Sequence, residues 1–228
     1  MIAAHDHIVR SFGEELRTLR EQVAHMWRLV LGQVNEAIEV LTAHDAARAG
    51  AVVDGDAEID ACERVIERSA LRLIALRQPR AQDLRMTVSA MKIAHSLERT
   101  GDIAKSMAKR VRRFEGAPAN AELTALVADL GRRVSAQHAK VLDAYESGDP
   151  GPAMEVWNAD AEVDAQADRL FRAVLDEMAR SPGEVGYYAH LLFVAKNLER
   201  VGDHATNLAE CVRYEVTGEE TLESRPRA

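Results

Sequence analysis

The sequence predicts an all-α protein made of two tandem, pseudo-symmetric three-helix bundles, with six long helices in all. Three observations support this prediction: the composition, the spacing of helix breakers, and an internal repeat. The chain has 228 residues, of which 47% are hydrophobic and 29% charged, whereas Phe, Trp and Tyr together supply only 4%. Such a composition favours helices, because strands need alternating runs of β-branched and aromatic residues.

Helix breakers divide the chain into six stretches with helical periodicity. The breakers are His44-Asp45, Gln78-Pro79, Gly116-Ala117-Pro118, Asp149-Pro150-Gly151-Pro152 and Ser181-Pro182-Gly183. We therefore expect helices over 6–44, 48–77, 81–114, 119–148, 151–180 and 184–217. The second helix is expected to start late or bend at Asp54-Gly55. Ser181 to Glu184 has the pattern of a capping box, Asp149 before Pro150 indicates a similar helix start, and the polar tail after Gly218 is expected to be loose.

An internal repeat relates the two halves of the chain. Residues 91–112 align with 192–213 at an offset of 101, and ten of these 22 positions are identical. Residues 56–61 align with 160–165 at an offset of 104, and five of these six positions are identical. A different loop length between the second and third helix of each unit accounts for the two offsets. We therefore predict one unit over 1–117, a second over 118–217 and a tail over 218–228. Each unit alone would expose an apolar face, so the two are expected to pack together.

Charge and cysteine content exclude several classes of protein. The 29 Lys and Arg against 37 Asp and Glu give a net charge of −8, which argues against nucleic acid as the main partner. Only Cys62 and Cys211 are present, which excludes a disulfide framework or a four-cysteine zinc site, and both are expected to be packing residues. Without a secretory signal pattern or a long apolar run, we expect a cytoplasmic protein with no membrane insertion.

Carboxylate pairs four residues apart occur at equivalent places in both halves. The first carboxylate set is Asp56, Asp60, Glu98 and Asp102, and the second is Asp160, Asp164, Glu199 and Asp203. Like charges with this spacing share a helix face and repel each other unless a cation lies between them. If the second and third helices of each unit are antiparallel neighbours, each set forms an oxygen-rich site for Mg, Mn, Fe or Ca. The alternative interpretation is a solvated acidic stripe on a scaffold that binds no metal.

Small residues lie beside these carboxylates. Ala94 and Gly101 flank Glu98, and Ala195 and Gly202 flank Glu199. A glycine destabilises a helix by about 1 kcal/mol relative to alanine, so its presence indicates that another helix or a ligand approaches closely.

Three segments resemble the PhoU family of phosphate-signalling regulators: LERTGD (97–102), LERVGDHATNLAE (198–210) and LRQPRAQDLR (76–85). The resemblance implies two pseudo-symmetric three-helix bundles whose carboxylate motifs, the eight residues above, bind iron, zinc, Mg or Mn. It also implies two partners, the ATPase subunit of a phosphate ABC transporter and a sensor histidine kinase. The implied activity is negative regulation of phosphate uptake and of phosphate-responsive genes when phosphate is plentiful, by a protein that is often a homodimer.

The two halves differ near their carboxylate sets. Asn207 and His204 of the second half correspond to Ser106 and Ile103 of the first, so we expect the first site to have fewer ligands and to bind metal more weakly. His95, His138 and His190 are not expected to bind metal, and Trp27 and Trp157 are expected in the core.

The competing function is a carboxylate-bridged di-metal helical-bundle enzyme or a metal-storage protein. Such enzymes use Glu-x-x-His pairs, and no glutamate stands three residues before any of the eight histidines. The phosphate-binding loop, the nucleophile elbow and the HExxH motif are also missing. We therefore predict no catalytic residues and a protein that is not an enzyme.

Overall fold

The structure, a computed structural model, describes the backbone of residues 2–114 and 120–220, and side chains from residue 11 onward within these ranges. All of its regular structure within these ranges is helical, which confirms the all-α prediction. The first unit contains α1 (Ile2–Ala43), α2 (Ala46–Arg77) and α3 (Ala81–Arg110), followed by the 3₁₀ turn η1 (Val111–Phe114). The second contains α4 (Ala121–Ser147), α5 (Gly151–Asn158), α6 (Asp160–Arg180), the 3₁₀ turn η2 (Pro182–Glu184) and α7 (Val185–Thr217).

Several helix ends follow from local sequence. The Asp45 side chain caps α2 by accepting hydrogen bonds from the backbone N–H groups of Ala47 and Arg48, at 3.1 and 3.0 Å. Asn120 caps α4 in the same way through the N–H of Leu123. Gly148 and Gly218 end α4 and α7 with φ of 72° and 76°, a left-handed conformation that glycine adopts without strain.

Three expectations about helix boundaries are wrong. The second helix runs without interruption through Gly55, because its inward positions on both sides of the glycine are packed. Ser181 makes no side-chain cap, and a 3₁₀ turn precedes α7 instead. The helix predicted over 151–180 is divided at Ala159, whose φ of −92° and ψ of 7° separate α5 from α6. The tail beyond residue 220 lies outside the described residues.

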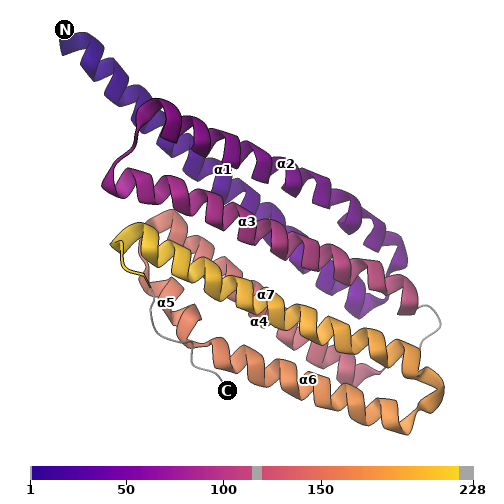
Figure 1. The fold of residues 1–228 in the computed structure, drawn as a ribbon. Coiled ribbons are helices and arrows are strands. Elements are labelled where there is room, and N and C mark those ends of the chain that lie inside the picture. Colours follow the sequence, from indigo (N-terminus) through magenta and orange to yellow (C-terminus); the bar gives the residue numbers. More distant parts are fainter. Residues whose placement is uncertain (1, 115–119, 221–228) are drawn as a thin grey trace.

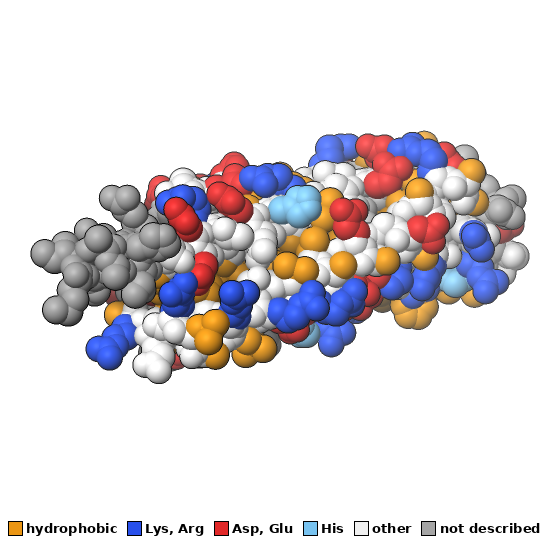
Figure 2. Space-filling view, turned by 90° about the horizontal axis from the view of Figure 1, so that it is seen from above, with side chains coloured by type: hydrophobic (Ala, Val, Ile, Leu, Met, Phe, Trp, Pro, Cys, Tyr) orange, Lys and Arg blue, Asp and Glu red, His pale blue; other side chains and the backbone are white. Residues whose placement is uncertain are grey.

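The helices of each unit pack against one another, and the units meet through α1 with α4 and α3 with α7 (Figure 1). Trp27 is fully buried and Trp157 nearly so, as expected. A buried polar contact also joins the units: the Arg20 guanidinium of α1 donates to the Glu215 carboxylate of α7 and to the Tyr145 carbonyl of α4, both at 2.5 Å. On the face seen from above Figure 1, acidic, basic and hydrophobic side chains are intermixed (Figure 2).

Candidate metal centre

Each unit brings its second and third helices together as antiparallel neighbours, α2 with α3 and α6 with α7 (Figure 1). We call the facing edges of α2 and α3 the first seam, and those of α6 and α7 the second seam. In the first seam, charged groups of the two helices meet: Lys105 of α3 contacts Asp56 of α2, and Glu98 of α3 lies near Glu63 of α2. Along α2 the acidic residues of the first seam are Asp56, Asp60 and Glu63, in steps of one helical turn.

The glycines beside the carboxylates are contacts between helices. A Cβ added to Gly202 would lie 2.8 Å from Cγ1 of Val163 on α6, closer than real side chains approach. A Cβ added to Gly101 would lie 3.1 Å from Oε1 of Gln33 on α1 and 3.3 Å from Ile59 of α2. The glycines therefore allow close packing of α3 and α7 against their neighbours, and in the first seam Glu98 of α3 lies near Glu63 of α2.

At one end of the first seam, which we call the inner end, a lysine lies between two of the carboxylates. Asp56 is only 3% exposed, and its Oδ2 accepts a hydrogen bond from the Lys105 ammonium of α3. The same ammonium lies 3.6 Å from Oδ1 of Asp102. The hydrogen bond to Asp56 and the negative charges of Asp56, Asp102 and Asp60 raise the pKa of Lys105. This end of the seam therefore has an internal positive charge.

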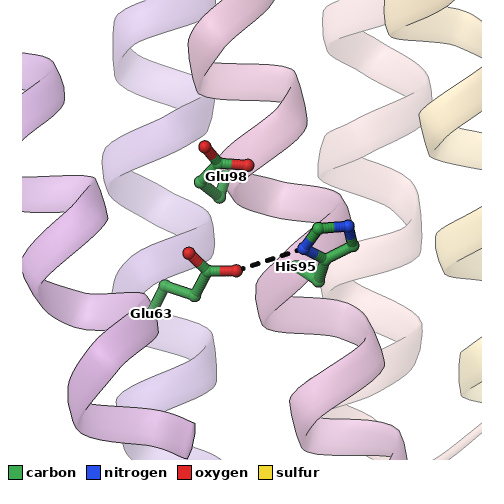
Figure 3. A group of neighbouring side chains, drawn as sticks. All are labelled: Glu63, His95 and Glu98. Atoms are coloured by element: carbon green, nitrogen blue, oxygen red, sulfur yellow. Dashed lines mark hydrogen bonds and ion pairs between the residues drawn. The ribbon is translucent and has the colours of Figure 1, made fainter.

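At the other end, the outer end, Glu63, His95 and Glu98 point toward one another (Figure 3). One ligand atom from each lies within 4.8 Å of those of the other two, and Nδ1 of His95 is 3.3 Å from Oε1 of Glu63. Burial raises the pKa of Glu98, and the charges of Asp102 and Glu63 raise it further. Negative charge is therefore crowded at this end. Among the described residues, this is the one group of three Asp, Glu, His or Cys side chains whose ligand atoms all lie within 4.8 Å of one another.

This trio was not predicted as a site from the sequence, although a signal was present. Glu63 follows Asp60 by three residues and His95 precedes Glu98 by three, so each lies on the seam face one turn from a predicted ligand. Whether they meet depends on the register of α2 against α3. An imidazole with two carboxylates fits Mn, Fe or Zn better than Mg or Ca, which prefer oxygen ligands alone.

The second seam has a different pattern of side chains. Asp160 is 5% exposed, as deeply buried as its counterpart Asp56. At the position of Lys105 stands Thr206, whose hydroxyl donates to the Asp203 carbonyl at 2.8 Å. The position of His95 is taken by Lys196, whose ammonium lies 2.6 Å from Oε1 of Glu199. Metal binding by the eight predicted residues stays a prediction, and the two seams are chemically different.

Two further histidines, His204 and His138, make contacts elsewhere. Nδ1 of His204 lies 2.9 Å from the Ser96 hydroxyl of α3, so this ring faces the contact between the units. His138 is fully buried, with Nε2 2.9 Å from the Val201 carbonyl, and burial lowers its pKa to about 4. Within the described residues, no helix combines the length and apolar character that a membrane span requires.

Comparison with known proteins gives consistent results along the chain. A family model described as the PhoU domain matches twice, over residues 23–111 and 127–212. A protein of Caulobacter vibrioides named phosphate-specific transport system accessory protein PhoU homolog is 45% identical over 222 residues, covering 97% of this chain and 96% of that protein. A Rhizobium meliloti protein of the same name is 38% identical, covering 98% and 94%.

Two solved structures share the fold. The crystal structure of PhoU from Pseudomonas aeruginosa superposes with a TM-score of 0.87 at 33% identity, covering 91% of this chain and all of that one. The phosphate transport system regulatory protein PhoU from Streptococcus pneumoniae gives a TM-score of 0.83 at 26% identity, covering 92% and 99%. Both matches extend over nearly the whole chain.

Proposed function

Because the chain belongs to the PhoU family, we propose that it is an accessory regulator of phosphate uptake that acts by binding other proteins. The observation that carries this proposal is the near-complete coverage in both directions by relatives named for phosphate transport, at up to 45% identity. We propose a cytoplasmic location, because the partners below act on that side of the membrane.

The proposed partners are the ATPase subunit of a phosphate ABC transporter and a sensor histidine kinase. When phosphate is plentiful, binding would restrain uptake and silence the kinase, so that phosphate-responsive genes are repressed. We also propose a homodimer. These proposals rest on membership of the family.

Metal ions would support this function by fixing the surface that partners bind. We propose that the two carboxylate sets, together with Glu63 and His95 in the first seam, hold divalent or trivalent ions such as Mn, Fe, Zn or Mg. The crowded negative charge around Glu98 supports this proposal, because a cation would relieve it. A bound ion supplies a rigid link between neighbouring helices, and the protein side chains position it. An ion whose free concentration is a hundred times its dissociation constant stabilises the folded state by about 2.7 kcal/mol.

Affinity capture from phosphate-replete cells tests the partner proposal. The wild-type protein is expected to recover the transporter ATPase and the histidine kinase, and a chelator or the double variant Glu199→Gln/Asp203→Asn should reduce this recovery. Glu67→Gln is a matched control, because Glu67 is exposed and one turn beyond Glu63. Recovery of neither partner by the wild-type protein would count against the regulator proposal.

Metal analysis tests the site itself. Protein purified without added metal should contain bound ions, and His95→Ala should weaken Zn²⁺ binding by about tenfold or more in calorimetry. Glu67→Gln should bind as the wild type does. Oxygen consumption with bound di-iron would favour the carboxylate-bridged enzyme instead.

A further inference from the structure

The two seams are not equivalent as cation sites, and Lys105 is the residue that distinguishes them. We propose that Lys105 is a built-in counter-ion that takes the place of a metal ion at the inner end of the first seam, and that any metal ion binding there must displace it. The first unit is thus held together at this end without metal, which narrows its proposed metal site to Glu63, His95 and Glu98 at the outer end. This inference rests on the proposed metal-binding function.

The contacts of the ammonium group support this assignment. It donates to Oδ2 of Asp56 and lies 3.6 Å from Oδ1 of Asp102, so it lies where an ion bridging these two carboxylates would lie. The Asp56 side chain is 4% exposed, whereas that of Lys105 is 28% exposed. A carboxylate so deeply buried needs a charged partner, because an unpaired buried charge is strongly destabilising. Lys105 supplies that partner from the neighbouring helix and thereby links α2 to α3.

The second seam has a different residue at the position that corresponds to Lys105. Asp160, the counterpart of Asp56 at the offset of 104, is equally buried, but the counterpart of Lys105 at the offset of 101 is Thr206. A threonine hydroxyl carries no charge, and this one already donates to the Asp203 carbonyl. The lysine of the second seam, Lys196, is at the opposite end, beside Glu199. A lysine therefore contacts a motif carboxylate in both seams, but at different positions along the helix.

Exclusion of metal by Lys105 can be tested with Lys105→Met, which removes the charge and keeps an apolar stem. Its melting temperature in EDTA is expected to fall by several degrees, because Asp56 loses its partner. Added Mn²⁺ should restore the melting temperature. Calorimetry should detect one more bound Mn²⁺ ion in Lys105→Met than in the wild type. The affinity of Lys105→Met for Mn²⁺ at this position should exceed that of the wild type by about tenfold or more. Lys109→Met, one turn further along α3 and exposed, is the matched control.

The double variant Asp56→Asn/Lys105→Met separates the inference from simple loss of folding. It removes both charges, so it should fold in EDTA nearly as the wild type does and gain no Mn²⁺ ion. If Lys105→Met folds only when Mn²⁺ is present, the inference is supported. If Mn²⁺ does not rescue it while the double variant folds, the inference is overturned.

The outcomes also separate the inference from the proposed function. Wild-type protein that binds Mn²⁺ with the same stoichiometry and affinity as Lys105→Met would overturn the role of Lys105 and leave metal binding intact. Wild-type protein that binds none, beside a Lys105→Met variant that does, would refute the proposed metal binding of the native chain and support the role of Lys105. Absence of Mn²⁺ binding in both would overturn both.

Discussion

Glu215→Gln should make the stability of this protein more sensitive to acid. Glu215 lies at the contact between the two units and is 4% exposed. Its Oε1 accepts a hydrogen bond from Arg20, whereas its buried Oε2 has no partner among the described residues. Burial raises the pKa of Glu215 to about 7, despite the opposing effect of Arg20, from the 4.5 of an ordinary glutamate.

The sign of the pH dependence follows from proton binding. Between pH 4.5 and about 7 the folded state holds a proton on Glu215 that the unfolded state has released, so stability falls as pH rises through this range. At 1.36 kcal/mol per pH unit the full effect is about 3 kcal/mol. His138 acts in the opposite direction, because burial lowers its pKa from 6.5 to about 4 and stability falls as pH falls through that range. Its full effect is also about 3 kcal/mol.

The two effects offset each other where the ranges overlap, between about pH 4.5 and 6.5. Glutamine cannot titrate, so Glu215→Gln leaves the effect of His138 uncompensated. The measured quantity is the difference in the free energy of unfolding, variant minus wild type. This difference should fall by up to about 3 kcal/mol as the pH is lowered from 7.5 to 4.5. The pKa of about 7 already includes the opposing effect of Arg20, so the loss of that charged bond is not counted separately.

Urea unfolding followed by circular dichroism at four pH values between 4.5 and 7.5 measures this difference. Glu67→Gln, a substitution on the exposed face of α2, is the control for the general effect of replacing a glutamate. A difference between Glu215→Gln and the wild type that stays constant over this pH range would refute the assignment of the raised pKa to this carboxyl group.

Three further predictions concern packing and reactivity. Gly202→Ala should destabilise the protein by about 1–2 kcal/mol in urea unfolding, because the added Cβ would lie 2.8 Å from Val163. Gly13→Ala is the control: because the space around Gly13 is open, this substitution should be neutral or should stabilise the protein by up to about 1 kcal/mol. Trp27→Ala should lower the free energy of unfolding by about 3–5 kcal/mol, because the ring is fully buried. Cys211, whose pKa burial raises to about 11, should react with iodoacetamide at pH 8 far more slowly in the folded state than in urea.

Much of the fold could be predicted from the sequence because it is encoded locally. Breakers and helical periodicity gave helix ends within about four residues of those observed wherever the described residues allow comparison. The break at Ala159 could not be predicted, since neither glycine nor proline marks it. The capping pattern at Ser181 was misleading because the preceding helix α6 ends at that same residue, and the backbone there forms a 3₁₀ turn.

The candidate site was only partly predictable, for a tertiary reason. Spacing along one helix places Asp56 with Asp60 and Glu98 with Asp102. The approach of Lys105 to Asp56 depends instead on the register between α2 and α3, which side-chain packing around Gly101 sets. A spacing of four residues therefore identified the seam but not the partner of each carboxylate.

Part of the acidic excess has cationic partners within the chain. The chain carries eight more acidic than basic side chains, the same number as the two carboxylate sets together. That numerical match does not mean that all eight lack a cation, because Lys105 contacts Asp56 and Asp102 and Lys196 contacts Glu199. Two glutamates and a histidine converge at the outer end of the first seam, where the Arg99 guanidinium lies 3.8 Å from Glu98.

Duplication explains how the two seams can share a backbone and differ in chemistry. Packing requires a glycine at positions 101 and 202, and Asp56 and Asp160 are equally buried, so these features are retained in both units. The residue three positions after the motif aspartate differs between the units: Lys105 contacts the buried Asp56 across the first seam, whereas Thr206 is fully buried and donates to the Asp203 carbonyl. Two identical ERxGD segments are therefore insufficient to define two identical metal sites. In our proposal, the residue three positions after the first of these aspartates, Lys105, supplies the cation of the first seam as an ammonium group in place of an ion from solution.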